Sequence, residues 1–452
     1  MTNSHRTAPK VLLSSRSHIG NLEGLHSVAG AQEVISLIKA RKTVTVLDLS
    51  HNELGDDGCR ELFRYLTSED GRRYKIGEIS LKDNKIGAHG LSEIAHYLVD
   101  NSHLRTLRLQ NNAFECDKAL TLSFVSAVNA SHLADLSLAT NNSLSDAFVS
   151  SFLTHLNTPH LRSLDLSATR ITALTTESLV NFLVSARGTY IETLNLSMND
   201  LDFRSVCLIV NTIQRHNFSL LRMEIYANGI AEEGKPGEDR EASGTSGNIA
   251  RTIHDLKRVL LRNDLLTKKT RDSAVALLPY ARALLIQTRR CRTPPPGSTD
   301  EPIDQPVALP SLPSSKPLQP KSHTVFPFCL LPMELQHYTL KFIAPFLSSA
   351  QFTRIFNYAC EPSTLPPLLP RLRGPGCIPD PSSLPFGMPR SGGCGGGQCM
   401  GPGNSVLCHR IKERDRWLAE VGCDRFEPTD GLPMDINELL RNENGHTTSK
   451  SP

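Results

Sequence analysis

One apolar pattern returns through the first half of this chain and restricts what the chain can fold into. The pattern is apolar-x-x-apolar-x-apolar-x-x-Asn-x-apolar, and clear copies are VTVLDLSHNEL at 44–54, IGEISLKDNKI at 76–86 and IETLNLSMNDL at 191–201. It occurs in seven copies, one of them degenerate, at spacings of 32, 28, 29, 28, 30 and 29 residues between Leu47, Ile79, Leu107, Leu136, Leu164, Leu194 and Met223. So regular a period indicates a repeat architecture with one structural unit per copy.

Each copy predicts a strand followed by a helix. Within the pattern apolar residues alternate, as in a strand, and between copies they recur at helical spacing, as Leu62, Phe63 and Leu66 do. One repeat cannot cover its own apolar residues, whereas stacked repeats cover one another. We therefore predict an α/β fold, a leucine-rich-repeat solenoid (horseshoe) with a parallel sheet on its concave side and helices outside.

An asparagine follows each strand where the chain turns, and we expect its amide to bond backbone groups of adjacent turns. Thr169 replaces it in the fifth repeat, which makes that position the weakest of the series. The fourth repeat carries one extra residue after its asparagine, so its turn is predicted to bulge. The asparagines are Asn52, Asn84, Asn112, Asn141, Asn199 and Asn228.

Residues 44 to about 230 resemble the ribonuclease-inhibitor-like group of leucine-rich-repeat proteins. The segments DLSHNELGDDGCRELFRYL and LKDNKIGAHGLSEIAHYL are most similar to repeats of Ran GTPase-activating proteins and NOD-like receptors. The resemblance to Ran GTPase-activating proteins implies a GTPase-activating role as one alternative. However, that family's catalytic residues find no matching positions here, and its acidic C-terminal tract is absent. The chain also lacks a phosphate-binding GxxxxGK[ST] loop, an HExxH motif and a GxSxG elbow at a strand end, so we predict no catalytic residue and no enzyme.

Proline separates a regular half from an irregular one, since 25 of the 29 prolines follow Thr293. The repeat domain is predicted over 21–290, with an N-terminal cap helix at Ala31–Ala40 and two C-terminal cap helices at Ile249–Arg262 and Lys268–Ile286, the second interrupted at Pro279. The remaining segments are a disordered N-terminus at 1–20, a mobile loop at 231–247, a Pro-rich linker at 291–326, a helical segment at 327–370, and a mostly disordered tail at 371–452 with one helix at Arg410–Val421.

The segment LPMELQHYTLKFIAPFLSSAQFTRIFNYA at 331–359 resembles an F-box. It departs from the family where Thr339 replaces an Ile or Leu, and it lacks a closing Trp. The resemblance implies a substrate receptor of a ubiquitin ligase, which docks a Skp1-like adaptor through Leu331, Pro332, Leu335 and Leu340. The alternative is an amphipathic helix pair without an adaptor.

The net charge and the cysteine positions limit which partners and ligands the sequence predicts. With 49 basic and 46 acidic residues the net charge is +3, which indicates neither nucleic acid nor an anionic membrane as a partner. Cys377, Cys394, Cys399, Cys408 and His409 fit no zinc spacing, so we interpret them as free thiols and predict no metal and no cofactor. The cytoplasm is the predicted location, with the nucleus as the alternative if the basic group at 289–292 is an import signal.

The candidate binding residues follow from strand alternation, because side chains that flank the inward leucines point to the concave face. This polar strip, charged at both ends with serines between, suits a protein segment, and we predict a non-enzymatic interaction scaffold. The predicted contact residues are Asp48, Glu78, Lys82, Arg108, Gln110, Asp135, Asp165, Asn195, Arg222, Glu224 and Tyr226.

Overall fold

The computed structural model describes residues 17–99, 101–115, 117–228, 243–292, 331–364 and 406–428. The chain divides between Leu265 and Leu266 into two compact units, rather than near residue 290. We call the first, up to Leu265, the repeat unit and the second, from Leu266 to Leu432, the helical unit.

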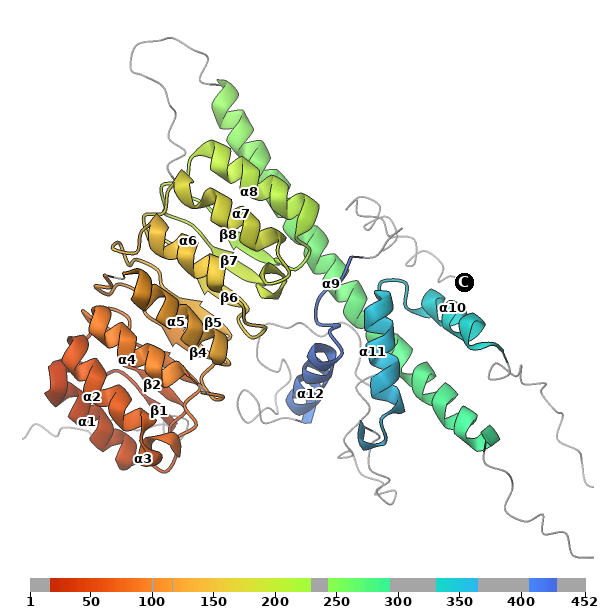
Figure 1. The fold of residues 1–452 in the computed structure, drawn as a ribbon, viewed down its shortest axis with the longest axis horizontal. Coiled ribbons are helices and arrows are strands. Elements are labelled where there is room, and N and C mark those ends of the chain that lie inside the picture. Colours follow the sequence, from red (N-terminus) through yellow and green to blue (C-terminus); the bar gives the residue numbers. More distant parts are fainter. Residues whose placement is uncertain are drawn as a thin grey trace, which may run out of the picture. The chain divides into compact units, whose positions relative to one another are not determined.

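The described residues of the repeat unit form one parallel sheet of eight strands, β1 to β8, in which each strand pairs with its neighbours in sequence (Figure 1). This confirms the predicted solenoid. Seven of the strands are the predicted ones, and the eighth, β1, lies before them. The strands are β1 His18–Ile19, β2 Val46–Asp48, β3 Glu78–Ser80, β4 Thr106–Arg108, β5 Asp135–Ser137, β6 Ser163–Asp165, β7 Thr193–Asn195 and β8 Arg222–Glu224.

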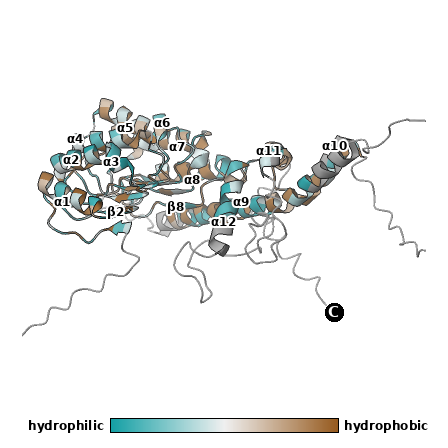
Figure 2. Ribbon diagram, turned by 90° about the horizontal axis from the view of Figure 1, so that it is seen from below, coloured by the Kyte–Doolittle hydropathy of each residue, from teal (hydrophilic) through white to brown (hydrophobic). Residues whose placement is uncertain are grey.

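A helix follows β2 to β7 and lies on the outer side of the sheet, and α1 precedes β2 in the same layer (Figure 1). In Figure 2 these helices carry both hydrophobic and hydrophilic residues, as helices with one buried face do. They are α1 Ser27–Lys39, α2 Gly55–Thr67, α4 Ala88–Leu98, α5 Lys118–Ala130, α6 Asp146–His155, α7 Thr176–Val184 and α8 Phe203–His216, with short turns α3 Glu69–Arg72, η2 Ala173–Thr175 and η3 Gly188–Tyr190.

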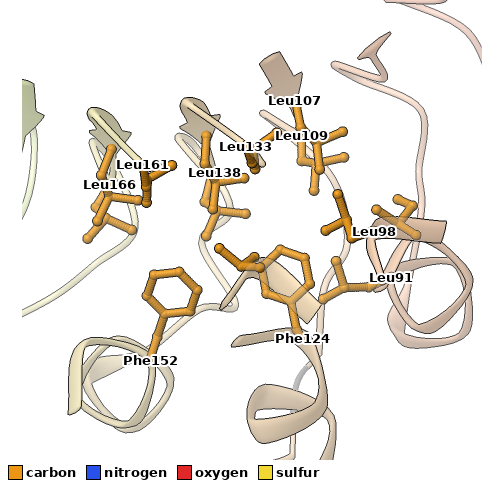
Figure 3. Packing of buried hydrophobic residues seen from close by; sticks show 14 of the residues in the cluster. Leu91, Leu98, Leu107, Leu109, Phe124, Leu133, Leu138, Phe152, Leu161 and Leu166 are labelled. Atoms are coloured by element: carbon orange, nitrogen blue, oxygen red, sulfur yellow. The ribbon is translucent and has the colours of Figure 1, made fainter. Parts of the chain in front are cut away.

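The core lies between the two layers. Figure 3 shows strand and loop leucines such as Leu107 and Leu138 pointing towards Phe124 of α5 and Phe152 of α6, and all four side chains are fully buried. The two phenylalanine rings lie 6.1 Å apart between centroids, so neighbouring helices are joined through their inner faces. Each large side chain buried here contributes about 1.5–3 kcal/mol of transfer free energy, which explains why the leucine pattern determines the fold.

The predicted hydrogen bonds of the repeat asparagines form, and we call this series of residues the asparagine ladder. Each ladder residue bridges a turn that contains a residue with left-handed backbone geometry. The residue before each ladder position, for example His51 (φ 60°) or Met198 (φ 58°), has left-handed backbone geometry although none of these residues is glycine. The Asn199 amide donates to the carbonyls of Leu196 at 3.0 Å and Ser197 at 3.3 Å, which lie on the far side of Met198. The same amide donates to Leu166 O of the preceding repeat at 2.9 Å. The ladder thus holds each turn and joins it to the preceding repeat.

Thr169 makes fewer of these contacts, as predicted. Its hydroxyl donates to Leu166 O of its own turn at 2.8 Å, and within the described part of the chain its side chain forms no hydrogen bond with the fourth repeat. Its N–H instead donates to Asn199 Oδ1 at 2.9 Å. The predicted bulge after Asn141 is present as a tight turn, since Leu144 N–H donates to Asn141 O at 3.0 Å.

The N-terminal end differs from prediction. His18 and Ile19, expected to be disordered, form β1, which pairs with Val46 and Leu47 of β2. Ile19 is buried and α1 begins at Ser27, four residues before the predicted cap helix. A two-residue strand carries no alternation, and for that reason the sequence pattern did not reveal it.

The two predicted C-terminal helices are one helix, α9, at Ser243–Arg292, which continues through Pro279. It also includes residues 243–247 of the predicted mobile loop, whose residues 231–242 lie outside the described residues. Proline removes one backbone hydrogen bond from the helix. Burial of neighbouring Ala274, Leu278 and Ala281 offsets that loss.

Within the repeat unit, α9 caps the last repeat. Arg262 Nη1 donates to Gln214 O at 2.6 Å and Nη2 to Asn217 O at 3.2 Å, at the C-terminal end of α8. Asn263 adds bonds to Asn217 O at 3.1 Å and Leu220 O at 2.9 Å. Helix carbonyls that would lack partners at the end of the solenoid are thereby satisfied.

The helical unit consists of the second part of α9 with α10 Met333–Ile343, α11 Ser349–Cys360, η5 Pro362–Thr364 and α12 Val406–Glu420. Its core joins Leu277, Leu340, Ile355 and Trp417, one residue from each helix. The helix predicted at Arg410–Val421 is present and begins four residues earlier. Residues 406–428 of the predicted disordered tail are therefore folded, and the rest of 371–452 lies outside the described residues.

Candidate protein-binding face

The sheet register places the predicted contact residues on one side of the sheet in three rows. Pairing of Val46, Glu78, Thr106, Asp135, Ser163, Thr193 and Arg222 defines the first row. The second row is Asp48, Ser80, Arg108, Ser137, Asp165, Asn195 and Glu224. Two residues further on, by the same alternation, a third row contains Lys82, Gln110 and Tyr226. All eleven predicted residues are exposed or half-buried on this face, and none is in the core.

The charges in the N-terminal half of the face balance in number, with Lys82 and Arg108 against Asp48 and Glu78. Arg108 forms an ion pair with Glu78 across β3 and β4. Asp48 accepts the Ser50 hydroxyl at 2.6 Å, and Ser50 Oγ lies 2.8 Å from Ser80 Oγ. This half therefore presents little unbalanced charge to a partner.

The middle of the face is acidic. Burial raises the pKa of Asp135, and the nearby carboxylates of Asp165 and Glu78 raise it further, while a hydrogen bond with Ser163 and the charge of Arg108 oppose the rise. Asp165 accepts the hydroxyls of Ser137 at 3.0 Å and Ser167 at 2.7 Å. A carboxylate whose pKa is raised by burial is held at a cost in stability, which is typical of functional positions.

The C-terminal end of the face is partly apolar. Tyr226 is 60% exposed, and its hydroxyl donates to Glu224 Oε2 at 3.3 Å. Met198, on the neighbouring turn, is 59% exposed, and its N–H donates to Tyr226 O at 2.9 Å. Two large side chains with apolar surface thus lie next to each other in solvent.

Met198 belongs to a row of turn residues that the sequence reasoning missed. These are the left-handed residues that precede the ladder positions, and they line the edge of the sheet beside the third row: His51, Asp83, Asn111, Thr140, Ala168, Met198 and Ala227. The first three bond to one another, with His51 Nδ1 at 3.2 Å and Asn111 Nδ2 at 3.0 Å from Asp83. The last four carry no charge, so the edge changes from polar to apolar along the solenoid. The only sequence signal is their place before the ladder residue.

A shallow cavity of about 200 Å³ lies away from this face, between Tyr74 and Tyr97 and beside the ends of α2 and α4. Its lining shares no residue with the three rows. Among the described residues no three His, Cys, Asp or Glu side chains are grouped to hold a metal ion. Cys377, Cys394 and Cys399 lie outside the described residues, and Cys408 and His409 belong to the first turns of α12.

The predicted adaptor-binding residues do not share one surface. Leu331 is half-buried, whereas Pro332 and Leu335 are exposed. Leu340 is only 3% exposed, because its side of α10 packs into the core of the helical unit. Leu340 is therefore a core residue, and its prediction as an adaptor contact is wrong for this structure. The outer side of α10 carries Leu335, Tyr338 and Phe342, and the last two rings meet edge-on at 5.2 Å.

Comparison with known proteins agrees with the repeat geometry. No described helix is long and apolar enough to cross a membrane. No curated protein matches the chain. A family model described as "Leucine Rich repeat" matches residues 42–63, which include β2 and the first nine residues of α2. The match covers one repeat, and the register of the sheet extends the same unit from β2 to β8, so the first half of the chain is a leucine-rich-repeat solenoid.

Proposed function

We propose that this protein is a non-enzymatic interaction scaffold that binds a partner protein on the three-row face. The observation that carries the proposal is the gathering of all eleven predicted residues on one side of a rigid sheet, with their side chains exposed or half-buried. Solenoids of stacked repeats commonly bind partners on such extended surfaces. The leucines and ladder asparagines maintain the fold, which leaves the residues between them to select the partner.

Two finer proposals rest on the sequence. The ribonuclease-inhibitor-like subtype is supported by the unit length and by a helix in each repeat from the second to the seventh strand. Location in the cytoplasm, or in the nucleus through the basic group at 289–292, is a prediction from composition alone.

A pair of substitutions tests the face. In Arg108→Ala/Tyr226→Ala, partner capture by the intact tagged protein is expected to fall by at least about tenfold, since large aromatic and arginine side chains contribute most to interfaces. Capture is measured by affinity purification and quantitative mass spectrometry. The control Arg64→Ala/Lys118→Ala changes exposed residues of α2 and α5 in the outer layer and should capture the same proteins as the wild type. Equal loss in both variants, or in neither, would exclude the three-row face as the binding site.

A second candidate function, adaptor binding by the F-box-like segment, is favoured by the outer side of α10. Tyr338 is 62% and Phe342 70% exposed, and with Leu335 they lie at helical positions i, i+3 and i+7. Such a stripe fits a groove lined with apolar residues. We propose that a Skp1-like adaptor contacts this stripe, which is shifted from the residues expected from the sequence.

Serine substitutions in this stripe test the second function. Tyr338→Ser/Phe342→Ser is expected to abolish co-purification of a Skp1-like adaptor with the intact protein, because the apolar contact area is lost. Tyr280→Ser is the control, since Tyr280 is an exposed aromatic residue of α9 in the same unit. If no adaptor co-purifies with the wild type, the ubiquitin-ligase function is excluded while the scaffold function still stands.

A further inference from the structure

The face formed by β5 to β8 carries more acidic than basic residues, with Asp135, Asp165 and Glu224 against Arg222. Among the described residues, Asp135 and Asp165 form no ion pair within 4.0 Å, and their hydrogen bonds come from serines. In the other half of the face, by contrast, Arg108 and Glu78 pair with each other. The two aspartates lie on adjacent strands, and their mutual influence raises the pKa of Asp135. A cation brought by a partner would satisfy both carboxylates.

A second feature at the same place points to an incoming polar group. Ser197 is 1% exposed, and its hydroxyl has no hydrogen-bond partner in the described part of the chain. It lies in the third row one repeat after Ser167, and its N–H donates to Asn195 Oδ1 at 3.0 Å on the same face. A buried hydroxyl without a partner costs about 1–3 kcal/mol, so a ligand that reached it would recover this free energy.

An apolar contact lies beside these polar groups. The exposed Met198 and Tyr226 follow β7 and β8, and Ala168 and Ala227 flank them in the turn row. From Asp165 on β6 to Tyr226 beyond β8 the sheet geometry gives roughly 12 Å, since strands lie about 4.8 Å apart and residues rise about 3.4 Å along a strand. An extended peptide covers that distance in about three to four residues.

We infer that the partner contributes an extended basic segment, which places a lysine or arginine at Asp135 and Asp165 and a large apolar side chain three or four residues away on Met198 and Tyr226. The inference rests on the proposed function of the three-row face and names the chemistry that this face selects. Charge complementarity determines the sign of the charge on the partner segment, and the distance between the two contacts determines the spacing of its contact residues.

Peptide selection tests the inference without knowledge of the partner. A phage-displayed library of random dodecapeptides is panned against the intact protein, and enriched peptides are remade with a fluorescent label for anisotropy titration. We expect enriched sequences to combine Lys or Arg with Leu, Ile, Phe or Met at a spacing of three or four residues. Enrichment of acidic peptides, of peptides without this spacing, or of none overturns the inference.

Matched variants connect the selected peptides to the site. Asp135→Asn/Asp165→Asn is expected to weaken peptide binding at least about tenfold and to remove most of its salt dependence. Asp57→Asn is the control, because Asp57 is an exposed residue of α2 in the outer layer, away from the three-row face, and should leave binding unchanged. Equal weakening by the control overturns the assignment to the two aspartates. If the Arg108→Ala/Tyr226→Ala variant loses its cellular partners while no basic peptide is selected, the scaffold function stands and only this inference fails.

Discussion

Replacing Asn199 with alanine is expected to lower the free energy of unfolding of the repeat unit by about 4 kcal/mol, because several buried polar groups lose their partners at once. The amide donates to the carbonyls of Leu166, Leu196 and Ser197. Its oxygen accepts from the N–H groups of Thr169 at 2.9 Å and Ile171 at 3.3 Å. Each unsatisfied buried group costs about 1–3 kcal/mol, although such costs are not additive.

Urea denaturation followed by far-UV circular dichroism measures the effect. Asn181→Ala is the matched control, since Asn181 is exposed on α7 and its replacement should change stability by less than about 0.5 kcal/mol. An Asn199→Ala protein that unfolds at the urea concentration of the control would mean that the ladder does not hold the turns. Position 199 is a sharper test than the other ladder positions. The fifth repeat has Thr169 in place of an asparagine, and both the N–H and the hydroxyl of Thr169 donate to the side-chain oxygen of Asn199.

The period of the leucines and asparagines was enough to predict the repeat unit, because the same residues that recur in sequence are the ones that stacking buries. Leu47 and Leu107 are both fully buried. Thr169 forms fewer hydrogen bonds than a ladder asparagine, as its shorter side chain predicts. The residues of the candidate face could be predicted from the sequence as well, since alternation along a strand decides which side chains point away from the core. Arg108 and Tyr226 lie where alternation places them.

The turn row and the helical unit could not be predicted in the same way. Met198 has left-handed geometry in a turn that the amide of Asn199 bridges, and a methionine gives no local sign of it. In the helical unit, Gln351 Nε2 donates to Gly422 O at 2.8 Å across 71 residues of chain. Contacts between such distant segments leave no period in the sequence, so α12 was predicted as a helix without its role in a core.

Arg262→Ala is the second substitution expected to have a large effect, and we expect a loss of about 3–5 kcal/mol in the free energy of unfolding, because several buried carbonyls lose a charged donor at once. The guanidinium is buried, and burial lowers its pKa to about 10, so it stays charged at neutral pH. It lies 4.5 Å from the centroid of the Phe218 ring. Its partners are the carbonyls of Ile213, Gln214 and Asn217 at the negative end of α8.

Because these partners are carbonyls rather than a carboxylate, the usual exchange of a buried ion pair for apolar residues should fail here. Arg262→Met keeps most of the volume but leaves the carbonyls without donors, so we expect it to be destabilised nearly as much as the alanine variant. Arg262→Lys offers one ammonium group in place of a planar fork and should recover about half of the loss. Arg258→Ala, at an exposed position of α9, is the control and should change stability by less than about 0.5 kcal/mol. If Arg262→Met were as stable as the wild type, α9 would be held to the last repeat by apolar packing, and its role as a cap would not depend on the α8 carbonyls.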